Sequence, residues 1–157
     1  MRCRGSSGFS LIELLIVLAL GATLASFAVP QLRKGLSSYR LSSTAYELAG
    51  ELNMARTLAA SRSTTYEVQL KASSRSYQVT DPSSPDSPPR IKKYLEPGIS
   101  FARLPSDTVA FFPRGHAHGG SIQIQDKYGK LAVIEVTATG LVQVSVNGEV
   151  SLADQQP

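Results

Sequence analysis

Glu13 is the residue whose surroundings most restrict its chemistry, because it lies in an otherwise uncharged apolar segment. It is the only charged residue among the 24 residues from Phe9 to Leu32. A helix of about 20 such residues spans a hydrocarbon core of about 30 Å, so this segment predicts a single membrane span. A carboxylate costs roughly 2.5–3.5 kcal/mol at the centre of such a span and less near its ends, so it is usually paired. We therefore expect Glu13 to have a partner.

His116 and His118 could in principle bind a metal ion, since two histidines one residue apart can share a metal on an extended backbone. The chain has no further histidine, and its one cysteine, Cys3, precedes the apolar segment, so a third ligand would have to be a carboxylate. The favoured alternative is a mobile glycine-rich loop over residues 115–121. That loop lacks the Gly-Lys-Ser/Thr ending of a phosphate-binding loop, and no serine lies in a nucleophile elbow. The sequence thus predicts no enzymatic activity, no metal and no cofactor.

The charge balance beyond the apolar segment argues against a nucleic-acid-binding domain. From Leu36 onward there are 12 lysines and arginines against 11 aspartates and glutamates. Proteins that bind the phosphate backbone usually gather basic residues on one face, and the only basic cluster here is Arg90 with Lys92 and Lys93. With Cys3 as the only cysteine, this part of the chain has no disulfide, which leaves the redox compartment undecided.

Hydrophobic periodicity predicts one long helix followed by a strand-rich domain. Beyond the span, apolar residues recur at steps of four and three along one helical face. They are Leu41, Ala45, Leu48, Leu52, Ala55 and Ala59. We expect the helix to run from Phe9 to about Ser61, with one backbone hydrogen bond removed at Pro30. After Ser63 the pattern alternates with period two between turns, which predicts seven or eight short strands. The fold class is therefore α+β, a long N-terminal helix packed on a C-terminal antiparallel β-sheet domain.

The chain is expected to divide into four segments. Residues 1–8 are basic and small, and they end at Gly8. An ordinary secretory signal places its apolar region before the cleavage site, whereas here the small residue precedes it, so a cut after Gly8 would remove the charges and keep the apolar segment. Residues 9–32 would then form the membrane-spanning half of the helix, residues 33–62 its amphipathic half and residues 63–157 the β-rich domain.

The run Gly8-Phe9-Ser10-Leu11-Ile12-Glu13 resembles the class III signal of type IV pilins and type II secretion pseudopilins. In that family a prepilin peptidase cuts after the glycine and methylates the new N-terminal residue, which implies cleavage between Gly8 and Phe9 and N-methylation of Phe9. The family's glutamate at the fifth mature position falls on Glu13, and its proline at the twenty-second falls on Pro30. The resemblance implies that both residues serve assembly, with Glu13 neutralising the N-terminal amine of a neighbouring subunit. Such a pair is strong only when both charges are present.

The second half of the chain is similar to the GspH/FimT branch of this family. The similarity rests on the helical pattern with Ala55-Arg56, on Phe112-Pro113-Arg114-Gly115 and on the strand pair around Gly140. It implies a minor pseudopilin of a type II secretion system, whose partners are prepilin peptidase, other pseudopilins or pilins, an inner-membrane assembly platform and, before assembly, membrane lipid. The expected location is the inner membrane, crossed once, with the globular domain in the periplasm.

The alternative interpretation is a FimT-like minor pilin that initiates a type IV pilus, in some cases with a role in DNA uptake. In the DNA-binding members the associated motif is a glycine followed by arginine, any residue and arginine. The matching positions here are Gly140-Leu141-Val142-Gln143, in which both arginines are absent. A nucleic-acid partner is therefore not expected.

The cleavage site gives a direct prediction. N-terminal sequencing of the processed protein should begin at Phe9, with a methylated amine. A mature chain that begins at any other residue would contradict the assignment of residues 1–8 as a leader peptide.

Overall fold

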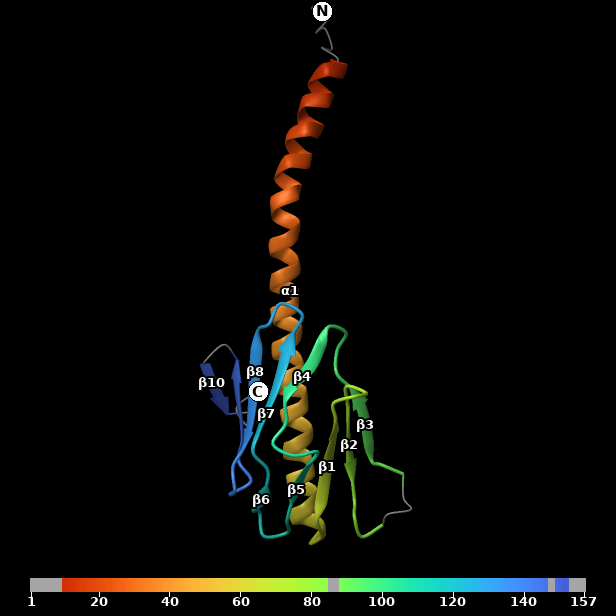
Figure 1. Ribbon diagram of the computed structural model, residues 1–157, viewed down its shortest axis with the longest axis vertical. Coiled ribbons are helices and arrows are strands. Elements are labelled where there is room, and N and C mark those ends of the chain that lie inside the picture. The colour runs from red at the N-terminus through yellow and green to blue at the C-terminus, as the bar shows by residue number, and fades with distance from the viewer. Residues whose placement is uncertain (1–9, 85–87, 147–148, 153–157) are drawn as a thin grey trace, which may run out of the picture. The chain divides into compact units, whose positions relative to one another are not determined.

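The computed structural model describes residues 10–84, 88–146 and 149–152, whose helix and strands are shown in Figure 1. These residues form one helix, α1 (Leu11–Arg62), followed by ten strands. The chain divides into two units, one ending at Leu36 and the other beginning at Ser37, so α1 contributes to both. The long helix and the antiparallel strands confirm the predicted α+β class.

In the second unit, one face of α1 is fully buried. The six residues of the predicted stripe, from Leu41 to Ala59, have no exposed surface, and Ala49 is buried beside them. The helix ends at Arg62, and Ser63 follows with a φ of 51°, the left-handed conformation that commonly terminates helices. The periodicity in the sequence therefore predicted both the buried face and the end of the helix.

The first sheet, sheet A, has the strand order β3-β2-β1-β5-β6 and is antiparallel throughout. Its strands are β1 (Tyr66–Lys71), β2 (Ser76–Thr80), β3 (Ile91–Tyr94), β5 (Thr108–Phe111) and β6 (Ala117–His118). Alternate residues of β1, Tyr66, Val68 and Leu70, point into the core, as the period of two predicted. The register places Val68 opposite Val79 on β2, so that apolar side chains face α1 in pairs.

The second sheet, sheet B, has the order β10-β9-β8-β7-β4 and is also antiparallel. Its strands are β4 (Ile99–Arg103), β7 (Ser121–Asp126), β8 (Leu131–Val136), β9 (Val142–Val146) and β10 (Glu149–Leu152). Asn147-Gly148, the strongest hairpin signal in the sequence, lies outside the described residues, but the two strands that it joins are paired. The buried residues of both sheets form one hydrophobic core with the buried face of α1.

The expectation of a mobile glycine-rich loop over residues 115–121 needs correction, because this segment contains β6. Here Phe112 N donates to His116 O over 3.0 Å, and Ala117 N donates to Ala138 O over 3.0 Å. A Cβ on Gly119 would collide with the side chain of Val136 on β8. Glycine is therefore needed here for a close approach of two backbones, and not for freedom of movement.

Lys93 joins β3 to α1 through two ion pairs. Its Nζ lies 2.8 Å from Glu47 Oε1 and 2.7 Å from Glu51 Oε1. The hydrogen bonds to Glu47 and then Glu51 raise the pKa of Lys93 above its usual value. Burial, followed by the Glu47 charge, raises the pKa of the neighbouring Tyr77 hydroxyl. Both groups therefore keep their protons at neutral pH, and Lys93 holds the last strand of sheet A against the helix.

Asp126, at the end of β7, ties sheet B to the first residue of the second unit. It is only 4% exposed, and its Oδ2 accepts a hydrogen bond of 2.9 Å from Ser37 Oγ. Its Oδ1 accepts from the backbone amides of Tyr128 at 2.8 Å and Lys130 at 2.9 Å. Burial by itself would raise the pKa of Asp126, but the Lys130 amide, the Ser37 hydroxyl and the Tyr128 amide together lower that pKa below its usual value. The carboxylate is therefore held in its ionised form.

Replacing this carboxylate should destabilise the fold in a pH-dependent way. Since the pKa of Asp126 is lower in the folded than in the unfolded chain, its ionised form stabilises the fold above about pH 4 and this stabilisation is lost as the pH falls through the folded-state pKa. Asp126→Asn should lower the free energy of unfolding by about 1–3 kcal/mol at pH 7. The deficit should shrink at more acidic pH, as measured by urea denaturation of the full chain in detergent.

Glu96→Gln is a suitable control, because Glu96 is an exposed carboxylate at the start of the turn before β4. This variant should leave the free energy of unfolding within about 0.5 kcal/mol of wild type, both at pH 7 and at acidic pH. A constant deficit for Asp126→Asn across the acid range would contradict the role of the ionised carboxylate.

Candidate functional site

The first unit presents an apolar helix surface that nothing in that unit covers. Every residue of α1 from Leu11 to Leu36 is exposed, and Leu11, Leu24 and Phe27 are 75%, 73% and 77% exposed. A helix that is apolar around its whole circumference is stable only in lipid or packed against other proteins. In the part of the chain that the structure describes, α1 is the one helix long and apolar enough to cross a membrane.

The hydroxyl groups in this apolar surface are satisfied within the helix itself. Thr23 Oγ1 donates to the carbonyls of Ala19 and Leu20, at 3.1 and 2.7 Å, and Ser26 Oγ donates to Thr23 O at 2.7 Å. In hydrocarbon a polar group without a partner is costly. These bonds therefore satisfy the hydroxyl groups of Thr23 and Ser26, and Glu13 is the one charged group among residues 11–32.

Glu13 lies in the first turn of α1. Leu14 N donates to Ser10 O over 3.2 Å, so the helix starts directly after Ser10. Because Glu13 lies next to the positive end of the helix dipole, the dipole stabilises a negative charge on its side chain. Among the described residues the only ion pairs are those of Lys93, so none of them neutralises Glu13.

The other residues predicted for processing and assembly lie apart from one another or outside the described part. Pro30 lies within α1, and the helix continues through it to Arg62. It is 17 residues from Glu13, or about 25 Å along the helix axis, so the two do not form one site. Gly8 and Phe9 lie outside the described residues.

His116 and His118 lie at β6, outside any larger group of potential metal ligands among the described residues. Both side chains are exposed, with His118 in β6 and His116 directly before it. The His116 ring stacks on the Phe112 ring, with the ring centroids 4.6 Å apart. Within residues 10–84, 88–146 and 149–152 there is no group of three or more histidines, cysteines or carboxylates that could hold an ion. The contact that the structure shows for His116 is therefore packing against the Phe112 ring.

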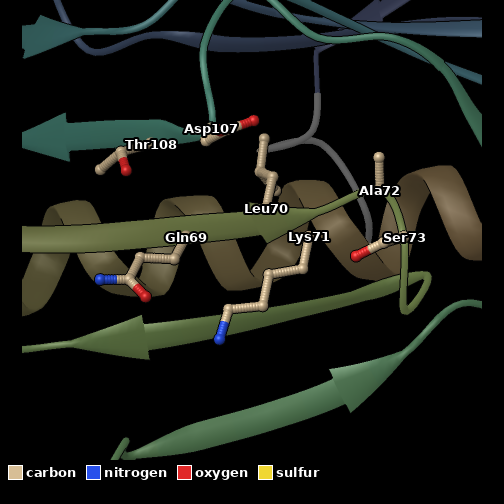
Figure 2. Close-up of a pocket in the computed structure, with 7 residues that line it drawn as sticks. All are labelled: Gln69, Leu70, Lys71, Ala72, Ser73, Asp107 and Thr108. Atoms are coloured by element: carbon tan, nitrogen blue, oxygen red, sulfur yellow. The ribbon is translucent and has the colours of Figure 1, made fainter.

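A cavity of about 450 Å³ lies where β1 runs into its hairpin turn and meets the start of β5 (Figure 2). Its lining contains an amine on Lys71 and a carboxylate on Asp107. Figure 2 shows these side chains pointing to opposite sides of β1, so they do not converge on a common point. The contact between the strands is instead a backbone hydrogen bond of 2.7 Å from Leu70 N to Asp107 O. The cavity holds no acid–base pair.

Arg56, Gly115 and Gly140, which are far apart in the sequence, come together at one point of the second unit. With Asn53 and Leu141, Arg56 and Gly115 line a cavity of about 390 Å³. Gly140 has a φ of 74°, and a Cβ added to it would collide with the carbonyl oxygen of Gly115 and lie 3.2 Å from Arg56 Nε. The segments on which the branch-level resemblance rests therefore meet as a packing junction of α1, sheet A and sheet B.

Two family comparisons match the two parts of the chain. Residues 3–29 match the prokaryotic N-terminal methylation motif, a range that includes Gly8, Phe9 and Glu13. Residues 44–148 match the family described as Type II transport protein GspH, a range that includes the junction of Arg56, Gly115 and Gly140. The chain belongs to the GspH family. The predicted family is therefore confirmed, at the level of the GspH branch.

Solved structures show the same fold at low sequence identity. The minor pseudopilin EpsH from the type 2 secretion system of Vibrio cholerae is 12% identical, with a TM-score of 0.59 over 70% of this chain and 99% of that one. The type IV minor pilin FimU of Pseudomonas aeruginosa, in two crystal forms, is 17% and 16% identical with a TM-score of 0.57 for each. The match covers 71% of this chain and 92% or 97% of FimU. No individually curated protein matches the sequence.

The sequence pattern did not reveal every residue that fixes the GspH-family domain. Ser37 and Asp126 are 89 residues apart and were not singled out, although both are buried and share a hydrogen bond. A polar residue at the start of the helical stripe and an aspartate beginning the turn Asp126-Lys127-Tyr128-Gly129 were the only available signals. Each is ordinary alone, and only their proximity gives them a structural role.

The packing at Gly140 gives a prediction with a matched control. Gly140→Ala should lower the free energy of unfolding by about 2–4 kcal/mol, because it adds a backbone clash to the cost of a positive φ. Gly129→Ala has a similar φ of 82° but open space around the added Cβ, and it should cost only about 1 kcal/mol. Equal losses for the two variants in chemical denaturation would contradict the close contact between Gly140 and Gly115.

Proposed function

We propose that this chain is a minor pseudopilin of a type II protein secretion system. After prepilin peptidase cleaves between Gly8 and Phe9, it would leave the inner membrane and join a periplasmic pseudopilus. The observation that supports this proposal is the attachment of an exposed apolar segment, Leu11–Leu36 of α1, to a GspH-family domain. Its carboxylate, Glu13, forms no ion pair with any other residue that the structure describes. A plain membrane anchor would have no use for Glu13.

The proposed role of residues 9–32 changes between two environments. In the membrane they span the hydrocarbon core, and in the pseudopilus they pack against the same segments of neighbouring subunits. Neither environment supplies water to Glu13, so its charge favours the position in which it meets the positive amine of a neighbouring Phe9. This ion pair would select one register of packing between neighbouring helices. Pro30 has no backbone N–H, so it leaves one helix carbonyl without its usual donor.

The remaining partners and the topology follow from the same proposal. Residues 1–8 are the leader, residues 33–62 carry the head domain on their amphipathic face, and residues 63–157 lie in the periplasm. The partners are prepilin peptidase, other pseudopilins, an inner-membrane assembly platform and lipid. Arg2, Arg4 and the initial amine give a slight preference for a cytoplasmic N-terminus over the Arg33-Lys34 side. The chain is a building block and a substrate of the peptidase, without enzymatic activity of its own.

A FimT-like minor pilin of a type IV pilus remains the second candidate. The fold is common to minor pseudopilins and minor pilins, so it does not favour one of them. The family match favours the secretion system. Leu141 and Gln143 occupy the positions where the DNA-binding members have arginine, which argues against a role in DNA uptake.

Glu13→Val should leave cleavage intact and reduce incorporation into filaments by at least about tenfold. The expected loss is large because the neighbour's amine would remain buried without its counter-charge, which costs about 3–5 kcal/mol. Immunoblotting of purified filaments and of the membrane fraction measures incorporation, and N-terminal sequencing measures cleavage.

Glu135→Gln removes one carboxylate from an exposed position on β8 and should be incorporated like wild type. Recovery of Glu13→Val in filaments at the wild-type level would reject the assembly role of Glu13. The filament that contains the wild-type chain separates the two candidate functions, since a minor pilin would appear in type IV pili and not in pseudopili.

A further inference from the structure

The turn between β7 and β8 combines cationic and amphipathic side chains. All five residues of Lys127-Tyr128-Gly129-Lys130-Leu131 are exposed, and Tyr128 and Leu131 each expose 44% of their surface. Lys127 Nζ lies 5.0 Å from the centre of the Tyr128 ring. Lysine together with tyrosine is typical of the headgroup layer of membranes, where one end of the side chain meets water and the other meets apolar material.

A cavity of about 460 Å³ beside this turn brings in a third cation. Its lining includes Arg75, from the turn before β2, and Lys127, together with Gly98 and Gly129. Asp126 is the carboxylate in the lining, and both of its oxygens already accept hydrogen bonds from Ser37, Tyr128 and Lys130. The exposed charges in the lining are therefore the cations of Arg75 and Lys127, with Lys130 next to them and the exposed carboxylate of Glu96 two residues before Gly98.

The turn is held close to the place where the second unit joins the apolar segment. Lys130 Nζ donates to Ser38 Oγ over 3.1 Å, and Asp126 accepts from Ser37. Ser37 follows Leu32 by five residues of α1, a rise of about 7.5 Å. The headgroup layer on each side of the hydrocarbon core is about 5–7 Å deep. Chain connectivity therefore keeps Ser37 close to this layer when residues 9–32 span the membrane, and the hydrogen bond from Ser37 to Asp126 keeps the turn close to Ser37.

We propose that the turn Lys127–Leu131, with Arg75, is a binding surface for anionic lipid headgroups on the periplasmic side of the membrane. The proposal rests on the membrane stage of the proposed function. The lysines and Arg75 would bind headgroup phosphates, and Tyr128 would lie at the headgroup level. The bound lipid would hold the head domain at the membrane until the subunit enters the filament.

The test uses the full chain in nanodiscs of phosphatidylcholine alone, or of equal parts phosphatidylcholine and phosphatidylglycerol. Because the sequence has no tryptophan, Tyr128→Trp places a single fluorescent reporter in the turn. Quenching by a lipid with a nitroxide on its headgroup should be much stronger in the discs that contain phosphatidylglycerol. Adding Lys127→Gln and Lys130→Gln should weaken this preference by about fivefold for each lysine.

Three further variants, each combined with Tyr128→Trp, distinguish headgroup binding from general effects. Arg62→Gln with Arg114→Gln removes the same charge elsewhere in the head domain and should leave the preference unchanged. Lys127→Arg with Lys130→Arg should retain it. Glu96→Gln removes an exposed carboxylate two residues before Gly98 and should increase it.

The outcomes separate this proposal from the proposed function. Insertion into nanodiscs without any effect of phosphatidylglycerol on the quenching of the tryptophan reporter, or an equal effect in the glutamine variant, would overturn the headgroup site and leave the pseudopilin role intact. Failure of the chain to insert at all would contradict the membrane stage itself, and with it this proposal.

Discussion

The buried face of α1 between Leu41 and Ala59 is the contact on which the rest of the second unit depends. Each sheet has one apolar face, and neither could bury that face alone. Four of the buried residues on this face are alanines, at positions 45, 49, 55 and 59, and none of them has exposed surface. The leucines between them belong to the same hydrophobic core as the buried residues of both sheets. The chain therefore needs no disulfide to hold ten short strands in one core.

The same helix has opposite requirements on either side of Leu36. Beyond it, apolar residues occupy one face and polar residues the other, which suits a helix packed on sheets. Before it, every described side chain of α1 is exposed, and between Leu11 and Leu32 only one is charged. Such a surface is incompatible with water, so the native environment of the first unit must come from lipid or from other chains. Under the proposed function, Glu13 would make these two environments unequal, because the amine of a neighbouring subunit would offer it a fixed cation.

The sequence predicted those parts of the fold that depend on local period, and it missed those that depend on contacts between distant segments. The helical stripe and the bounds of β2 and β10 follow from the alternation of apolar residues and from turn residues. β6 was missed because a strand of two residues gives no periodic signal. Its partners on β5 and after β8 are known only once the sheets are assembled. The junction of Arg56, Gly115 and Gly140 was visible as a family pattern, but its physical basis, a backbone contact that excludes any side chain at Gly140, required the structure.

The ion pairs of Lys93 have a consequence for how this protein can polymerise. β3 is the last strand of sheet A, and its outer backbone groups could accept a strand from another molecule. A lysine directed inward on such a strand, fixed by Glu47 and Glu51 of α1, disfavours a second sheet continuing from it. In the proposed filament the subunits would join through their helices, and pairing of strands between molecules would compete with that assembly. Glu47 and Glu51 of α1 thus disfavour aggregation through this edge of sheet A.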